Sequence, residues 1–270
     1  MCGKQVIAQK SLGIIRDKSL EITKPLEQLS KGEIERRQCI SRVLTHVLKY
    51  LTWEFVNRDF QWLLPVIFSK STDPLWPDSG ASIEKRIEVE IYEEKVKTTS
   101  SMILHKMVTC SLAHPKLFIL SPNIRIEKRE RATSGIHAYE FTQLDFEVRN
   151  ATSENIRRLV EEIIYGLISS LKKEMRDELL YLERYHRLRV TANPLRVYDR
   201  EELENRYGRE WGTRMLFELN NPVWVTNIPR EFYDFEDFRS GKWDNYDLLL
   251  PKYGEVLSGS RRAVSYTHLT

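Results

Sequence analysis

A long alternating segment, residues 138–148, is the feature of this sequence that most limits its fold. In the second half of the segment every second residue is apolar, and the alternating positions along the segment carry polar and aromatic side chains. The apolar series is Leu144, Phe146 and Val148, and the other series is Tyr139, Phe141, Gln143, Asp145 and Glu147. Successive side chains of a β-strand point to opposite faces, so the pattern predicts a long strand with one face on a core.

The segment before it repeats this alternation. Ile124 and Ile126 are expected to point one way, and Arg125, Glu127 and Arg129 the other. An arginine fork on such a face suits a phosphate or carboxylate, and an aromatic ring beside it can stack on a base. The pattern therefore fits a floor for a nucleotide and an amino acid. An ordinary solvent-facing strand surface is the alternative that the pattern leaves open.

Two amphipathic helices are predicted from apolar residues at i, i+3, i+4 and i+7 spacing. The first covers residues 34–55 and ends near Asn57; the second follows an N-cap at Thr152 or Ser153. Short strands are expected in RIEVEIY (86–92), KLFILS (116–121), NIRIEKRE (123–130), PVWVTNIP (222–229) and NYDLLLP (245–251). Residues 172–210 are charge-rich and are expected to be helix and loop. Strands before and after long helices predict an α+β fold.

Composition excludes several classes of protein. The 270 residues include 42 basic and 39 acidic ones, a net charge of +3 that is too small to indicate nucleic-acid binding by itself. Cys2, Cys39 and Cys110 form no CxxC spacing, so neither a disulfide framework nor a zinc site is expected. No apolar run approaches the roughly 18 residues of a membrane span, and no secretory signal is visible. We therefore expect a cytoplasmic protein without a membrane partner.

The order of the polar strands resembles motif 2 of the aspartyl- and asparaginyl-tRNA synthetases. The resemblance rests on Ile124-Arg125-Ile126-Glu127, a basic loop, and then HAYEFTQLDFE at 137–147. The helix that runs into Pro65 resembles motif 1, and residues 247–262 resemble the stretch before motif 3. The phrases TDPLWPD (72–78), SSMILHK (100–106), FILSPNIR (118–125) and NIPREFYD (227–234) resemble most the archaeal asparagine synthetases that descend from these enzymes.

The resemblance implies a class II synthetase-like antiparallel sheet flanked by helices, in a homodimer formed through motif 1 around Pro65. It also implies roles for individual residues. Catalysis would depend on Arg125, Lys106 and Arg262, and Mg²⁺ would be held by Asp247 and Glu255. ATP would bind to Arg125, Glu127, His137, Phe141, Asp247 and Glu255. The substrate would contact Ser101, Lys106, Gln143, Asp145 and Arg262. An ordinary solvated lysine at Lys106 and ordinary strand-end carboxylates at Asp247 and Glu255 are the alternatives.

The implied reaction uses ATP, Mg²⁺, aspartate and ammonia. An aspartate carboxylate attacks the α-phosphorus and expels pyrophosphate, and ammonia then attacks the aspartyl adenylate to give asparagine and AMP. Residues 1–33 are too few for the five-stranded OB barrel of the tRNA synthetases. An asparagine synthetase is therefore the main hypothesis, and tRNA is not expected as a partner. The alternatives are a catalytic fragment of an aspartyl- or asparaginyl-tRNA synthetase and a non-catalytic adenylate-binding paralogue.

The predicted organisation is an N-terminal extension at 1–33 and a catalytic domain at 34–262. That domain is expected to be incomplete, because motif 3 would follow Arg262. Residues 263–270, AVSYTHLT, resemble no part of the family and are expected to be a non-native tail, so the chain as written is expected to be inactive. One further departure concerns Ser100-Ser101-Met102-Ile103, which stands where the synthetases carry a Gln-Ser-Pro-Gln loop.

Overall fold

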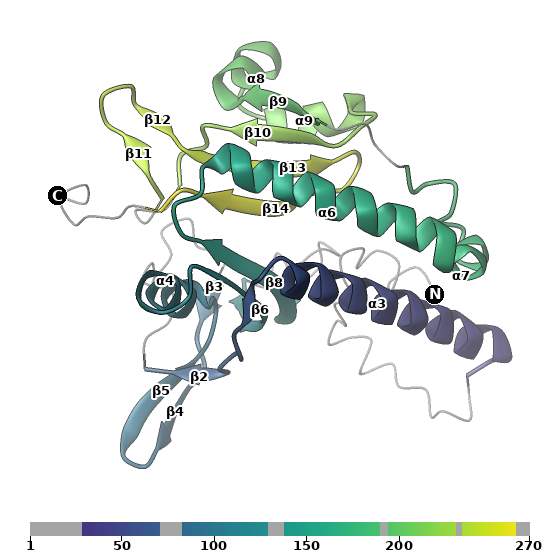
Figure 1. Cartoon of the computed structure of the whole chain (residues 1–270), viewed down its shortest axis with the longest axis horizontal. Coiled ribbons are helices and arrows are strands. Elements are labelled where there is room, and N and C mark those ends of the chain that lie inside the picture. Colours follow the sequence, from purple (N-terminus) through teal and green to yellow (C-terminus); the bar gives the residue numbers. More distant parts are fainter. Residues whose placement is uncertain (1–28, 71–82, 129–137, 190–193, 231–233, 263–270) are drawn as a thin grey trace. The chain divides into compact units, whose positions relative to one another are not determined.

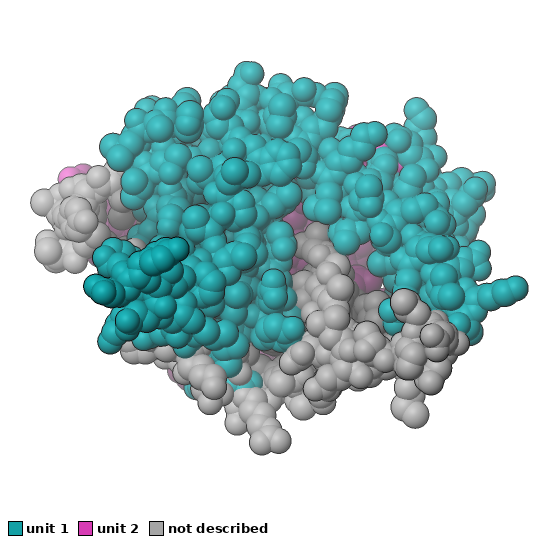
Figure 2. All heavy atoms as spheres, turned by 90° about the horizontal axis from the view of Figure 1, so that it is seen from below, with its two compact units in different colours: residues 1–150, 171–186 teal, residues 151–170, 187–270 magenta. Residues whose placement is uncertain are grey.

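The structure, a computed structural model, describes residues 29–70, 83–128, 138–189, 194–230 and 234–262 (Figure 1). The chain divides into two compact units. Unit 1 comprises residues 1–150 and 171–186, and unit 2 comprises residues 151–170 and 187–270 (Figure 2). Each unit is described by itself below. Among the helices of the described ranges, none is both long and apolar enough to cross a membrane.

The first described helix of unit 1 is α3 (Lys31–Asn57). Its start is fixed by a capping box, in which the Ser30 hydroxyl accepts from the Glu33 N–H and the Glu33 carboxylate accepts from the Ser30 N–H. Two backbone donors that the first turn leaves without a helical partner are satisfied in this way. The helix therefore begins three residues before the apolar stripe that predicted it, and it ends at the predicted residue.

The central sheet of unit 1 has the order β1-β6-β8. Strands β6 (Lys116–Ile124) and β8 (Glu140–Val148) are antiparallel, in register from Lys116↔Val148 to Ile124↔Glu140, and β1 (Gln61–Trp62) runs parallel to β6. The predicted long strand at 138–148 is confirmed. Residues 116–124 form one strand, whereas two strands were predicted there. Pro122 lies beyond Leu117 and Phe118, the two residues of β6 that pair with β1, and so has an edge position on that side.

The apolar face of this sheet packs against the end of α3. The Phe55 ring stacks on Phe118, with centroids 5.2 Å apart, and lies 5.1 Å from Phe146. Phe60 and Trp62 extend the cluster through contacts with Phe146 and Phe118. Phe146, from the middle of the predicted apolar series, thus joins an aromatic cluster with Phe55 and Phe118. Helix α4 (Ile103–Leu112) covers the opposite, polar face, and α7 (Arg176–Tyr181) packs on α3 (Figure 1).

Two small sheets complete unit 1. One has the order β2-β5-β4 and consists of β2 (Phe68–Ser69), β4 (Glu88–Ile91) and β5 (Glu94–Thr98). The predicted strand at 86–92 is thus the first arm of a hairpin, because the chain turns at Tyr92 and Glu93, both with positive φ. The other sheet pairs β3 (Ile83–Lys85) with β7 (Ile126–Glu127), which follows β6 after Arg125.

Unit 2 contains the sheet β14-β13-β10-β9. Its strands are β9 (Arg196–Asp199), β10 (Val223–Thr226), β13 (Asn245–Leu250) and β14 (Gly254–Ser260), and β9 is parallel to β10. Helices α8 (Arg200–Tyr207) and α9 (Trp211–Glu218) pack on it through Leu203 and Met215. The prediction for 172–210 missed β9, because four residues with two charges give too little alternation to identify a strand.

Two further elements lie in or reach unit 2. Strands β11 (Glu236–Asp237) and β12 (Lys242–Trp243) form a hairpin. Helix α6 (Ser153–Glu174) begins in unit 2, and its last turn belongs to unit 1. The Thr152 hydroxyl accepts from the Asn155 N–H, so the first of the two predicted N-cap residues is the one that caps this helix.

Candidate active site

The polar face of β6 and β8 holds a buried lysine. Lys106 Nζ, from α4, lies 3.2 Å from Asp145 Oδ1 and 3.3 Å from Glu147 Oε1. Only 8% of the lysine side chain is exposed. Its burial follows from the helix register, which directs Lys106 toward the strand where alternate residues are acidic. The solvated-lysine alternative is therefore wrong, and Lys106 and Asp145, predicted for one substrate site, lie in contact.

A chain of side-chain hydrogen bonds continues along the same face. Asn123 Nδ2 donates to Gln143 Oε1 at 2.8 Å, and the Ser121 hydroxyl donates to Asn123 Oδ1 at 3.1 Å. Ser121 and Asn123 are fully buried. Gln143 is exposed, and its bond to the buried Asn123 orients its side chain on this face. An exposed amide that is oriented in this way can meet a polar ligand group.

Arg125 lies at the end of β6, at the break before β7. Its Nε donates to the Ser100 carbonyl at 2.9 Å, and its guanidinium carbon lies 5.1 Å from the Phe141 ring centroid. Two of the six residues that the resemblance assigned to ATP, Arg125 and Phe141, are thus adjacent. A guanidinium beside an aromatic face can bind a phosphate while the ring receives a base.

Ser101 shapes the backbone before α4. Its hydroxyl accepts from the Ile103 N–H at 3.2 Å, which closes a local turn at the helix start. The neighbouring side chains Thr99 and Ser100 are fully buried, and the Thr99 hydroxyl donates to the Val66 carbonyl at 3.0 Å. The segment is therefore rigidly held next to Arg125. The described contact of Ser101 is therefore a structural one, with the backbone of Ile103.

The candidate residues of unit 2 form a charged cluster on β13, β14 and the segment after β10. Asp247 is buried and forms an ion pair with Arg230. Burial, followed by the charge of Glu255, raises the pKa of Asp247 to about 7, against the opposing effect of Arg230. Burial would lower the pKa of Arg230, but the charges of Asp247, Glu255 and Asp234 more than offset this and raise it. Arg230 therefore stays charged.

Arg262 lies just beyond β14 and is paired within the chain. Its Nη1 donates to Asp234 Oδ1 at 2.7 Å and to the Ser260 hydroxyl at 2.8 Å. Ser260 also donates to Asp234 Oδ1, and Asp234 and Arg262 form an isolated antiparallel bridge. The Asp234 side chain is 2% exposed and that of Arg262 is 20% exposed. A buried carboxylate thus holds the guanidinium that the sequence assigned to substrate.

The carboxylates of Asp247 and Glu255 fit a magnesium ion that also binds phosphate. Mg²⁺ in nucleotide sites uses one or two carboxylates together with substrate phosphates, rather than a complete protein cage. The described residues contain no group of three or more His, Cys, Asp or Glu side chains placed to hold a metal. The raised pKa of Asp247 indicates a buried carboxyl that a divalent cation would stabilise in its ionised form.

His137, Arg129 and the part of the basic loop between them lie outside the described residues. Glu127 is placed through its backbone in β7. Lys106, Arg125, Phe141, Gln143 and Asp145 lie in unit 1, whereas Asp247, Glu255 and Arg262 lie in unit 2.

Sequence reasoning missed four contributors to these clusters: Glu147 as a partner of Lys106, Asn123, Arg230 and Asp234. Glu147 and Asn123 could have been found, because both fall on the alternating polar face. Arg230 and Asp234 occur in the phrase NIPREFYD, but nothing in its local pattern indicates ion pairs with Asp247 and Arg262. Those pairs join residues 17 and 28 positions apart.

Comparison with known proteins identifies the family. The model of class II tRNA synthetases (D, K and N) matches residues 79–270. The asparagine–tRNA ligase of Koribacter versatilis is 30% identical over 262 residues, which cover 87% of this chain and 56% of that protein. The corresponding protein of Thermoplasma acidophilum is 23% identical, with 85% and 57% covered. The chain thus spans a little over half the length of these relatives.

Solved structures share the fold. The asparaginyl-tRNA synthetase of Pyrococcus horikoshii, in complex with asparaginyl-adenylate, superposes with a TM-score of 0.73 at 18% identity, covering 92% of this chain and 61% of that one. A putative aspartyl-tRNA synthetase from Leishmania major gives a TM-score of 0.65 at 15% identity, covering 86% of this chain and 54% of that one. The predicted class II fold is confirmed. The chain belongs to the class II tRNA synthetases of the D, K and N type.

Proposed function

We propose that this chain carries the amino-acid-activating site of an enzyme that joins asparagine or aspartate to AMP. The observation that carries the proposal is the polar floor of β6 and β8, where Arg125 lies over Phe141 and Lys106 contacts Asp145. In the reaction, a carboxylate oxygen of the amino acid attacks the α-phosphorus of ATP. The bond to the β-phosphate oxygen breaks, and pyrophosphate leaves.

The residues of unit 1 would act mainly by positioning and charge neutralisation. Arg125 would bind the α-phosphate, where negative charge accumulates in the transition state, and Phe141 would stack on the adenine. Lys106 would meet a carboxylate of the amino acid, and Asp145 would accept from its ammonium group. Lys106 and Asp145 neutralise each other in the absence of a ligand. A bound amino acid could replace this one ion pair by two, between its carboxylate and Lys106 and between its ammonium group and Asp145.

Asp247 and Glu255 would hold Mg²⁺, which when bound neutralises phosphate charge and orients the leaving pyrophosphate. When no Mg²⁺ is bound, Arg230 would neutralise the negative charge of Asp247. Glu127 and His137 would complete the nucleotide contacts, and Ser101, Gln143 and Arg262 those of the amino acid. These assignments follow the family resemblance of the sequence.

We favour tRNA as the acceptor of the activated amino acid. The family and the curated relatives are tRNA ligases, which supports this alternative better than the asparagine synthetase hypothesis. One observation keeps ammonia as a second candidate acceptor. Met102 and Ile103, both almost fully buried, stand where the synthetases carry the polar Gln-Ser-Pro-Gln loop.

Binding measurements on the 270-residue chain, and exchange measurements on a protein that joins these residues to the predicted motif 3, test the proposal. Calorimetry should detect binding of stable sulfamoyl analogues of the aminoacyl adenylates, and labelled pyrophosphate should exchange into ATP in the presence of the amino acid. Arg125→Lys should reduce exchange by about 100-fold or more, because it removes a planar phosphate fork. Arg158→Ala, on the exposed side of α6, is the matched control. Absence of both binding and exchange would contradict activation.

The acceptor is decided by product analysis. Aminoacyl-tRNA formed from an added tRNA pool would support the tRNA ligase assignment. Equal amounts of asparagine and AMP, formed from aspartate and ammonium without tRNA, would instead support the asparagine synthetase.

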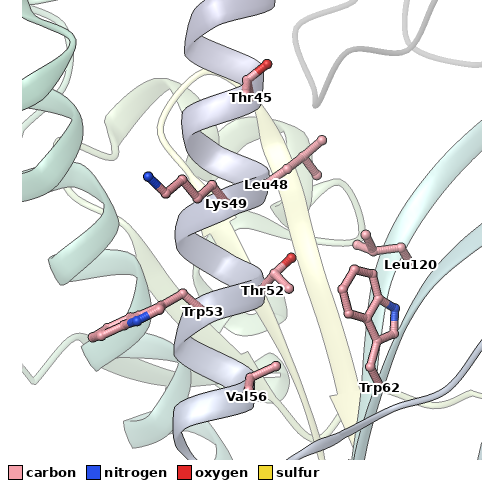
Figure 3. A pocket seen from close by; sticks show the side chains of 8 residues that line it. All are labelled: Thr45, Leu48, Lys49, Thr52, Trp53, Val56, Trp62 and Leu120. Atoms are coloured by element: carbon pink, nitrogen blue, oxygen red, sulfur yellow. The ribbon is translucent and has the colours of Figure 1, made fainter.

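We also propose a homodimer formed through the outer face of α3. Leu48, Trp53, Val56 and Trp62 are 39–59% exposed, and they line a shallow apolar groove between α3 and the sheet edge (Figure 3). Leu64, Val66, Ile67 and Phe68 extend this exposed apolar surface through the Pro65 region. Exposed apolar side chains gathered on α3 and residues 62–68 support an interface there.

A further inference from the structure

Arg262 is bound by a carboxylate of its own chain, which changes what the guanidinium can recognise. Asp234 Oδ1 accepts from Arg262 Nη1 at 2.7 Å, and Ser260 bridges the two side chains. The second guanidinium of the cluster, Arg230, is paired with Asp247. Arg262 is therefore the guanidinium that Asp234 contacts directly, while the charge of Asp234 also acts on Arg230.

The backbone holds this arrangement in place. The Phe235 N–H donates to the Arg261 carbonyl at 2.9 Å, and the Arg261 N–H donates to the Asp244 carbonyl at 2.9 Å. Asp234 and Arg262 are bridge partners. Because the Asp234 side chain is 2% exposed, it acts from behind Arg262, whose side chain is ten times more exposed. The geometry is that of a buried residue that positions a more accessible one.

Charge then distinguishes two kinds of ligand group at Arg262. A ligand carboxylate would be the second anion on one guanidinium, and like charges that share a site repel each other. An amide oxygen also accepts a hydrogen bond from arginine but carries no net charge. The pair Asp234–Arg262 should therefore accept a side-chain amide more readily than a carboxylate.

We propose that Asp234 is a positioning and specificity-determining residue, which sets Arg262 to recognise the side-chain amide of asparagine in preference to the carboxylate of aspartate. The inference rests on the proposed function, because it requires that Arg262 faces the amino acid side chain. It goes beyond that function by assigning the choice between acid and amide to one residue.

Calorimetry with the asparaginyl and aspartyl sulfamoyl-adenosine analogues tests the inference on the full chain. The wild-type chain should bind the asparaginyl analogue at least about tenfold more tightly. Asp234→Asn removes the charge with nearly the same shape, and it should reduce this ratio to about twofold or less by strengthening the aspartyl complex. Asp234→Glu keeps the charge and should keep the preference for the amide. Glu202→Gln, an exposed carboxylate on α8, should leave the ratio unchanged.

Three results would overturn the inference. The first is a wild-type preference for the aspartyl analogue, which decides the matter even where Asp234→Asn does not fold. The second is an unchanged ratio in a folded Asp234→Asn protein. The third is failure of the wild-type chain to bind either analogue, which would also contradict the proposed function; the first two would leave that function standing.

Discussion

At the scale of single residues, the candidate site is built from charges that are largely compensated inside the protein. Lys106 is shared by Asp145 and Glu147, Arg230 is paired with Asp247, and each of these side chains is less than one-fifth exposed. Buried ion pairs contribute little net stability, but breaking one leaves an uncompensated charge. A ligand charge that replaces one member of an ion pair therefore costs the protein less stability than a substitution that removes that member.

Lys106→Met should destabilise the protein by about 3–5 kcal/mol, because Asp145 and Glu147 would face each other without a cation. Denaturant unfolding near neutral pH measures this. Lys173→Met, on an exposed position of α6, should change the free energy by no more than about 0.5 kcal/mol. Adding Asp145→Asn and Glu147→Gln to Lys106→Met should restore part of the loss; failure to do so would indicate that lost packing is the main cause.

Asp247 predicts a pH dependence of stability. Its pKa in the folded protein is about 7, because of burial and of Glu255, whereas an unfolded aspartate has a pKa of about 3.9. The folded state therefore binds this proton more tightly. The stabilising contribution is complete below about pH 4 and is lost as pH rises through about 7. Asp247→Asn should weaken the decline in unfolding free energy between these values, and an identical pH profile would contradict the assignment.

At the scale of elements, the loop of the β4–β5 hairpin has positive φ angles at two residues whose side chains disfavour them. Ile91 pairs with Glu94, so Tyr92 and Glu93 form a two-residue loop with φ of 51° and 67°. Such turns favour asparagine and glycine, because other residues in this region are sterically strained. Tyr92 is 95% exposed, so its side chain contributes little packing that would offset the strain.

Replacing Tyr92-Glu93 by Asn-Gly should stabilise the hairpin by about 1–2 kcal/mol, through relief of backbone strain. Hydrogen exchange of the amides in Glu94–Thr98 measures the local change. An Ala-Ala replacement in the same loop is the control, since it removes the side chains and keeps the strain. Equal protection in both variants would show that the turn is not the source of strain.

At the scale of the whole molecule, one group of exposed apolar side chains lies on α3 and residues 61–68 of unit 1. If this surface is the homodimer interface, a charge at its centre should prevent association, because the charge would be buried without a partner. Trp53, 59% exposed, is the residue to change. Trp53→Glu should be monomeric in sedimentation equilibrium at concentrations where the wild type is dimeric.

The matched control for that experiment is Phe217→Glu. Phe217 is 82% exposed on α9, so this variant adds the same charge at an exposed aromatic outside the proposed interface. It should associate like the wild type. A monomeric wild type, or a dimeric Trp53→Glu protein, would contradict the proposed interface.

The sequence by itself determined the elements with long, regular patterns. The alternation at 138–148 identified β8 and both of its faces, and the apolar stripes identified α3 and α6. These signals are local, because a strand repeats every two residues and a helix every 3.6. The order of motifs also identified the class II fold, and from it a tRNA synthetase catalytic fragment as an alternative to the asparagine synthetase.

Tertiary structure alone decided which charges meet. The pairs Lys106–Glu147, Arg230–Asp247 and Asp234–Arg262 join separate elements, and no periodicity in the sequence encodes them. Burial likewise excluded the solvated-lysine alternative at Lys106 and made this residue a buried ion-pair partner, and it raised the pKa of Asp247. The physical reason is that Coulomb interaction and desolvation depend on distance in space, whereas sequence patterns report only which face of an element a residue occupies.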